Sequence, residues 1–214
     1  MKRALLVLGC ITVAAVGSPG RASAQLVGMP VWNSPKGGTG LTIAGDFGSP
    51  DSVGGKGSVY AGRVVVGLSA LTLSATVGSR HPSATGVNVT EYGGTAALRL
   101  IGGSLIPISV HLQGGGARFT ESGIRNTRGT VALGFAIDLP TPGVSLEPWV
   151  APGLRVTHSS GSTDTNFGIA GGLTLGLGML GLHAAVDYES VPGGGHTKTI
   201  GIGAHLSLRP SFGL

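Results

Sequence analysis

The chain has 214 residues, of which 41 are glycine and only 11% are charged, while 41% are hydrophobic. This length suits one domain, and high hydrophobicity with few charges excludes an intrinsically disordered chain. The charged fraction is less than half of the roughly 25% found in soluble domains, which argues against an ordinary water-soluble enzyme.

The first 24 residues have the three regions of a secretory signal peptide. Two basic residues follow the first Met, Ala4 to Val16 is an apolar stretch, and Ala22-Ser23-Ala24 is a cleavage motif before Gln25. Cleavage there would remove Cys10 and three basic residues, which lowers the formal net charge from +5 to +2. The mature chain is therefore expected to form no disulfide, and its charge gives no reason to bind nucleic acid.

The rest of the chain is expected to consist of a leader and one domain. Residues 25–38 contain two prolines and two adjacent glycines, which predict a loose leader before a domain at 39–214. From residue 39 onward, apolar residues alternate with small or polar ones, the pattern of strands that have two unlike faces. Ten such segments follow, at 39–47, 57–68, 70–80, 90–101, 106–118, 128–139, 144–157, 166–177, 179–189 and 196–208.

The connections between these segments alternate in length. Those at 48–56, 81–89, 119–127, 158–165 and 190–195 are long and polar, whereas those at 69, 102–105, 140–143 and 178 are short. Long loops at one end and tight turns at the other are typical of transmembrane β-barrels, as are strands of about 9–11 residues. The sequence therefore predicts an all-β, antiparallel up-and-down barrel of ten strands, with eight strands as the alternative.

The two strand faces differ as a membrane barrel requires. One face is apolar, and the other consists mostly of Gly, Ala, Ser and Thr, which could line a narrow lumen but would make a charge-poor soluble surface. Charged residues inside the strands lie on this second face, and we expect them to pair as a lumen charge network that partly plugs the interior. The network has six members: Arg63, Arg99, Asp138, Glu147, Arg155 and Asp187.

Aromatic residues give an independent indication of a membrane. Five of them lie on the apolar face near the long-loop ends of their strands: Phe47, Tyr60, Tyr92, Phe167 and Tyr188. Aromatic rings suit the half-hydrated headgroup level of a bilayer, so this set predicts an aromatic girdle.

In alternation, loop pattern and aromatic placement, residues 39–214 resemble bacterial outer-membrane β-barrel proteins of the small porin-like or opacity type. The last strand of that family carries alternating apolar residues that end in an aromatic, and the alternation here continues from Ile200 to Phe212. The resemblance implies export to the outer membrane, insertion by the barrel-assembly machinery, and contact with membrane lipids and lipopolysaccharide. It also implies a structural role or a narrow pore for small solutes, with a surface adhesin acting through the loops as an alternative.

Arginines at the third long loop suggest how lipopolysaccharide could be contacted. Arg118, Arg125 and Arg128 gather there, and arginine binds phosphate groups well.

One short motif raises the alternative of an enzyme. His158-Ser159-Ser160 resembles the His-x-Ser-Asn motif of lipid A 3-O-deacylases, in which the histidine is the base and the serine the nucleophile. Gly161 stands where that family has asparagine, and the segment 166–177 lacks the acid that would orient the base. We therefore expect no enzyme activity, and with scattered histidines we expect no metal or other cofactor.

Overall fold

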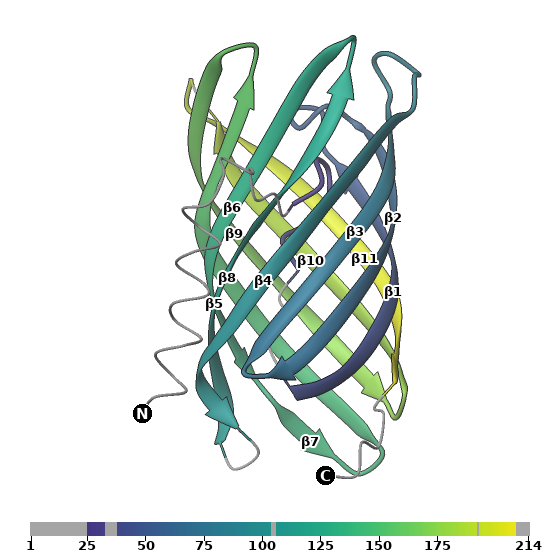
Figure 1. Cartoon of the computed structure of the whole chain (residues 1–214), viewed down its shortest axis with the longest axis vertical. Coiled ribbons are helices and arrows are strands. Elements are labelled where there is room, and N and C mark those ends of the chain that lie inside the picture. Colours follow the sequence, from purple (N-terminus) through teal and green to yellow (C-terminus); the bar gives the residue numbers. More distant parts are fainter. Residues whose placement is uncertain (1–24, 33–37, 104–105, 192, 209–214) are drawn as a thin grey trace.

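The computed structural model describes residues 25–32, 38–103, 106–191 and 193–208, so the expected signal peptide and Phe212 lie outside the described residues. Ten long strands form one closed barrel, shown in Figure 1, in which each strand pairs antiparallel with its neighbours and β1 closes on β11. The short β7 continues β6 after Asp138 and pairs with the start of β8. The strands are β1 (Gly38–Pro50), β2 (Gly57–Ser69), β3 (Leu71–Pro82), β4 (Val89–Gly103), β5 (Ile106–Glu121), β6 (Ile124–Ile137), β7 (Leu139–Thr141), β8 (Val144–Ser159), β9 (Ser162–Leu177), β10 (Leu180–Val191) and β11 (Gly195–Leu208).

The prediction of a ten-stranded antiparallel barrel is confirmed, and the eight-stranded alternative is wrong. The alternation succeeded because each strand presents one face outward and one inward along most of its length. The end of β4 departs from it, since the register with β5 shifts there and Leu100 and Ile101 are both exposed. Among the described residues, no helix is both long and apolar enough to cross a membrane.

Two of the predicted long loops are wrong. The β5–β6 and β8–β9 hairpins continue through most of 119–127 and 158–165, and each closes with a two-residue turn. Ser122 and Gly123 have φ of 52° and 77°, and Ser160 and Gly161 have φ of 49° and 85°. Two successive positive φ angles match the twist of a tight hairpin. The sequence hid these strand ends because their side chains are polar, whereas the ladder is held by backbone hydrogen bonds. We call the end of the barrel with these hairpins and the 51–56 and 83–88 connections the loop end, and the opposite end the turn end.

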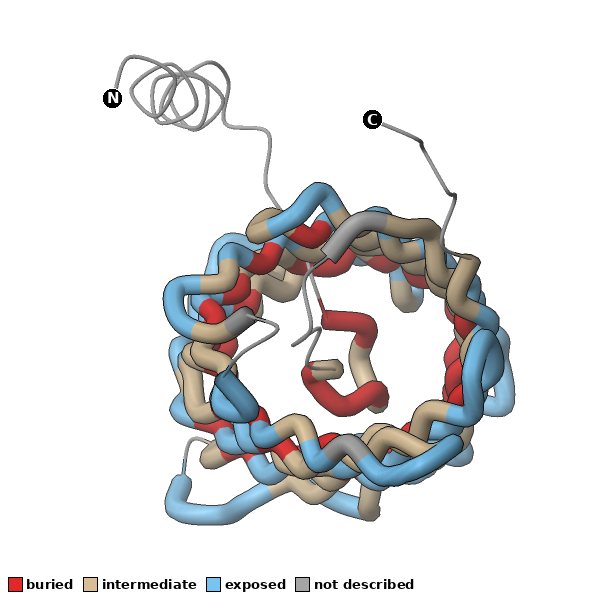
Figure 2. The backbone as a smooth tube through the Cα atoms, turned by 90° about the horizontal axis from the view of Figure 1, so that it is seen from below, coloured by how far each residue is buried: buried red, intermediate tan, exposed pale blue. Residues whose placement is uncertain are grey.

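The outer face of the barrel is apolar and the inner wall is made of small residues. Val131 is 56% exposed on the outside, whereas its neighbour on β6, Ala132, is buried inside, and Ala151 on β8 is completely buried. Figure 2 shows this alternation of exposed and buried residues around the ring. A continuous belt of exposed apolar side chains is not stable in water, so it marks a surface that another apolar phase covers.

The lumen of the barrel is occupied by its own chain. Residues Gln25–Trp32, which we call the inner segment, lie inside the ring of strands in Figure 2, and Leu26 and Met29 are buried there. A turn shapes the segment, since Met29 N donates to Leu26 O at 3.2 Å and Gly28 has φ of 78°. The sequence predicted only a loose leader here, and its place inside the barrel is a finding of the structure.

Candidate functional site

One buried carboxylate holds the inner segment near both of its ends. Asp187 on β10 accepts hydrogen bonds from Gln25 Nε2 at 2.9 Å and from Val31 N at 3.0 Å through Oδ2. Its other oxygen accepts from Arg155 Nη2 on β8 at 3.0 Å, and the Arg155 side chain is completely buried. Because a buried charge is stable only when it is paired and hydrogen-bonded, Asp187 needs both Arg155 and the inner segment.

A second carboxylate binds the segment nearer the loop end. Glu91 on β4 accepts Val27 N at 2.7 Å through Oε2 and Arg80 Nε at 2.7 Å through Oε1. Arg80 on β3 also donates to Glu121 Oε2 at 2.9 Å. Glu91 is completely buried, so this network ties a backbone amide of the inner segment to three strands of the wall.

Both polar atoms of the Gln25 side chain form hydrogen bonds. Its oxygen accepts from Thr130 Oγ1 at 3.3 Å and from Arg128 Nη2 at 3.4 Å, while its nitrogen also donates to Met29 O at 2.7 Å. Arg128 forms an ion pair with Glu189. Arg128 therefore faces the lumen. The sequence suggested that it gathers with Arg118 and Arg125, but those two residues have outward parity.

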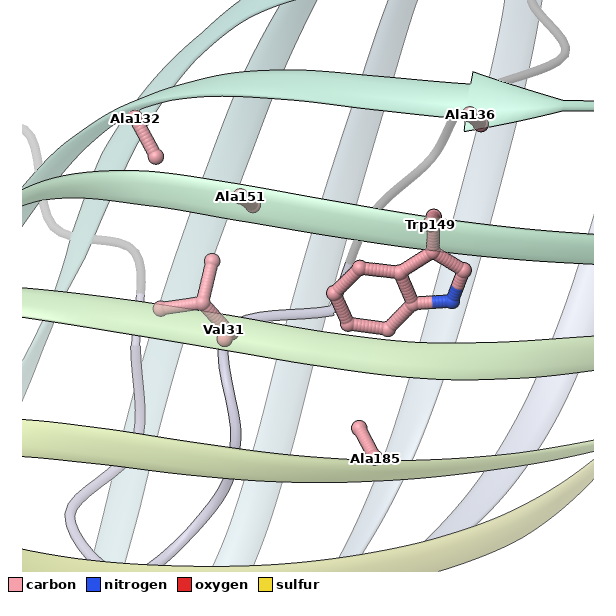
Figure 3. Packing of buried hydrophobic residues seen from close by; sticks show 7 residues of the cluster. Val31, Ala132, Ala136, Trp149, Ala151 and Ala185 are labelled. Carbon is pink, nitrogen blue, oxygen red and sulfur yellow. The ribbon is translucent and has the colours of Figure 1, made fainter.

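Apolar contacts with the barrel wall also hold the inner segment in place. Val31 packs into a cluster with Trp149 and with alanines of β6, β8, β9 and β10, as Figure 3 shows for most of its members. Small wall residues make this possible. A Cβ at Gly201 would lie 2.7 Å from Pro30, and one at Gly172 would lie 2.6 Å from the Trp149 ring. Larger residues at these glycines would displace the segment or the indole ring.

A third polar cluster lies beside Trp32. Asp46 on β1 pairs with Arg63 Nε at 2.9 Å and with His183 Nε2 at 2.6 Å. His183 Nδ1 lies 3.2 Å from His205 Nδ1, and the Trp32 ring meets the His183 ring edge-on at a centroid distance of 4.6 Å. No group of three or more metal-ligating side chains occurs among the described residues.

A small cavity remains beside the inner segment. Its volume is about 40 Å³, and it lies between the segment and the wall formed by β1 to β6. Polar side chains of the wall face Met29 and Trp32 across it: Asp46, Arg63, Ser74, Thr76, Thr95 and Gln113.

The residues of the expected lumen charge network fall into separate groups. Arg155 pairs with Asp187 and Arg63 with Asp46, as described above. Arg99, Asp138 and Glu147 belong to the part of the wall nearer the turn end, where Glu147 is buried on β8 and Asp138 N donates to Pro107 O. The sequence allows either Arg99 or Arg155 as the counter-ion for Asp138 and Glu147, and the structure places the Arg155 guanidinium against Asp187 instead.

Several members of these networks are not among the residues predicted from the sequence. Arg80, Glu91, Arg128 and Glu189 all have the inward parity of their strands, and that parity could have identified them. Gln25 carried no such signal, because it precedes every strand.

The aromatic residues of the expected girdle all lie on the outer parity. Tyr60, Tyr92 and Phe167 are exposed, and Phe47 lies beside Tyr60 with ring centroids 5.2 Å apart. Two outward cations accompany the set. Arg118 is the cross-strand partner of Tyr92, and Lys198 Nζ lies 5.9 Å from the Tyr188 ring centroid.

The motif that suggested a hydrolase has no catalytic geometry. His158 Nδ1 lies 2.8 Å from Thr163 Oγ1, across the hairpin, and Ser160 lies in the two-residue turn. The nearest acid in the hairpin, Asp164, is the cross-strand partner of Thr157. His158 has the outward parity of β8 and Asp164 the inward parity of β9, so the wall of the barrel separates base and acid.

Comparisons with known proteins identify the fold. No protein-family model matches the sequence, and no curated protein matches it. Among solved structures, the β domain of the Bordetella autotransporter BrkA is similar with a TM-score of 0.53 and 14% identity, over 80% of this chain and 100% of that one. The N-terminal barrel of Pseudomonas aeruginosa OprF has a TM-score of 0.40 and 12% identity, over 82% of this chain and 100% of that one. The Yersinia pestis attachment invasion locus protein Ail has a TM-score of 0.35 and 13% identity, over 80% of this chain and 100% of that one. The chain has the fold of bacterial outer-membrane β-barrel proteins.

Proposed function

We propose that this chain is a bacterial outer-membrane barrel, exported with a cleaved signal peptide and inserted by the barrel-assembly machinery. The support is the belt of exposed apolar side chains on a closed barrel, since a bilayer core is the phase that such a belt suits.

The charges agree with this placement. On the strands, the described acidic side chains have inward parity, whereas Arg118, Arg125 and Lys198 have outward parity near the loop end. There they are placed to meet the phosphates of lipopolysaccharide.

The proposed role of the barrel is structural, with at most a narrow passage for small solutes. One observation carries this proposal: the inner segment lies in the lumen and is held there by Asp187 and Glu91. An adhesin acting through its loops is less well supported, because two of the five loop-end connections are two-residue turns.

Fractionation and conductance test this proposal together. The protein should leave the cell envelope only with detergent, and the refolded protein should show small currents in a planar bilayer, because the inner segment leaves little open cross-section. Recovery of a folded, detergent-free protein from the periplasm would refute the location. A wide and steady pore would refute the filled lumen.

We further propose that the barrel has no hydrolase activity. The wild type and Ser160→Ala should both leave the lipid A of a Gram-negative host unchanged, because among the described residues His158 contacts Thr163 and no carboxylate. Mass spectrometry of extracted lipid A measures this. Loss of an acyl chain with the wild type but not with Ser160→Ala would show that the hydrolase alternative is correct.

A further inference from the structure

We propose that Gln25 is a modification site that the closed barrel protects. It stays an open glutamine while the inner segment is in place, and it cyclises to pyroglutamate when the segment leaves. This inference rests on the proposed function, because cleavage of the signal peptide before Gln25 makes it the first residue of the mature chain. The modification weakens the hold on the segment and therefore widens the passage through the barrel.

An N-terminal glutamine carries both reacting groups of this modification. The unprotonated α-amine attacks Cδ of the side-chain carboxamide, so a bond forms between the α-nitrogen and Cδ, and the bond between Cδ and Nε2 breaks. The proton that the amine loses leaves with Nε2 as ammonia, and a five-membered lactam remains. Because the reaction is intramolecular, its rate depends on how often the two groups reach the attacking geometry.

The structure fixes the carboxamide of Gln25 from both sides. Nε2 donates to Met29 O at 2.7 Å and to Asp187 Oδ2 at 2.9 Å, which uses both of its hydrogens. Oε1 accepts from Thr130 Oγ1 at 3.3 Å and from Arg128 Nη2 at 3.4 Å. Cyclisation expels Nε2, so both bonds of this atom must break before the ring is complete. The inner segment in place therefore opposes the reaction.

Burial opposes the reaction as well. Gln25 is 7% exposed, and the inner segment lies inside the ring of strands in Figure 2. Water normally carries the proton from the amine to the leaving nitrogen, and little water reaches a residue that is enclosed in this way. When the segment leaves the lumen, the four hydrogen bonds and the burial of Gln25 are lost together.

The lactam cannot replace glutamine in the lumen. It has one N–H where the carboxamide has two, so it cannot donate to both Met29 O and Asp187 Oδ2. Asp187 keeps Val31 N and Arg155 but loses one of its donors, and a buried carboxylate with fewer hydrogen bonds is less stable. Water opens the lactam to glutamate and not to glutamine, so the change is one-way.

Mass spectrometry of the intact protein and of its N-terminal peptide tests the site. The full chain is exported in a Gram-negative host, purified from the envelope and reconstituted in lipid vesicles at neutral pH. Loss of one ammonia from Gln25 is followed there and in the same protein unfolded in urea. We expect the loss to be at least about tenfold slower in the folded protein, because the segment must first leave its place.

Two variants test the hold on the carboxamide. Asp187→Asn removes the charge that binds Nε2, so the folded variant should lose ammonia faster than the folded wild type. Asp164→Asn is the matched control, since it makes the same change at an inward position of β9 for which the described residues show no contact with the inner segment. Its rate should stay within about twofold of the wild type. Heat-modified gel migration confirms that each variant is folded.

A conductance measurement tests the consequence. Protein that is cyclised in urea and then refolded should open more often in a planar bilayer than protein refolded before cyclisation. Equal opening would overturn the weakened hold.

The mass measurement separates the inference from the proposed function. Equal rates in folded and unfolded protein, equal rates in the two variants, or complete cyclisation in freshly purified folded protein would overturn the protection and leave the proposed function in place. A mass that includes residues before Gln25 would overturn the proposed cleavage and, with it, this inference.

Discussion

Removing the inner segment is expected to produce the largest change in behaviour of any variant considered. Protein refolded from residue 33 onward should show a single-channel conductance roughly tenfold above that of protein refolded from residue 25. A ten-stranded barrel encloses slightly more space than its wall side chains fill, and without residues 25–32 that space is open to water and ions. Planar-bilayer recording measures the change.

A point substitution provides the control for this deletion. Asp187→Asn removes the charge that holds Gln25 and Val31, and it also leaves Arg155 buried without its ionic partner. Breaking a buried pair costs about 3–5 kcal/mol, so we expect frequent openings and lower thermal stability with the full chain length kept. Equal conductance in the deletion variant and the full-length protein would show that the segment does not restrict the lumen.

A charge on the outer face is expected to cause the second large effect. Leu133 lies on the outward parity of β6, opposite Leu112 of β5, within the apolar belt. Leu133→Arg should destabilise the folded barrel in a bilayer by about 2–4 kcal/mol, because an arginine would then face lipid near the middle of the membrane. Urea titration of folding into lipid vesicles, followed by gel migration, measures the loss.

The control for Leu133→Arg keeps position 133 apolar. Leu133→Met preserves the approximate size and the apolar character of the side chain, so it should cost less than about 1.5 kcal/mol. A lumen-facing arginine such as Ala132→Arg is not a suitable control, because Ala132 is buried in the cluster with Val31 and Trp149 and that variant would be damaging for a different reason. Equal losses in Leu133→Arg and Leu133→Met would mean that the outer belt does not face lipid.

The strands could be predicted because alternation is a local property. Apolar residues two positions apart lie on the same face of a strand. The predicted ends of β2, β3 and β11 therefore agree with the observed ends to within one or two residues. The polar hairpin ends around Ser122 and Ser160 were missed, because their pairing depends on backbone hydrogen bonds and not on side-chain pattern.

The candidate site was much less predictable. Gln25 and Asp187 are 162 residues apart in the chain, and nothing in the composition of either neighbourhood links them. Residues 25–32 have no periodicity, so their position depends on the barrel that forms around them. Parity identified Arg155 and Asp187 as inward, but only the register of β8, β9 and β10 shows that they are paired.

The closure of β1 on β11 has a consequence for the order of assembly. The inner segment lies before β1 in the chain, and it contacts Asp187 of β10, one strand before the last. Once Phe47 and Ile202 come together at the seam, the ring is complete and the segment is enclosed. The amides of Val27 and Val31, each bonded to an interior carboxylate, can then exchange with solvent only when the segment withdraws through an end of the barrel or the seam reopens. Exchange of these two amides therefore reports how often the inner segment leaves its position inside the closed ring.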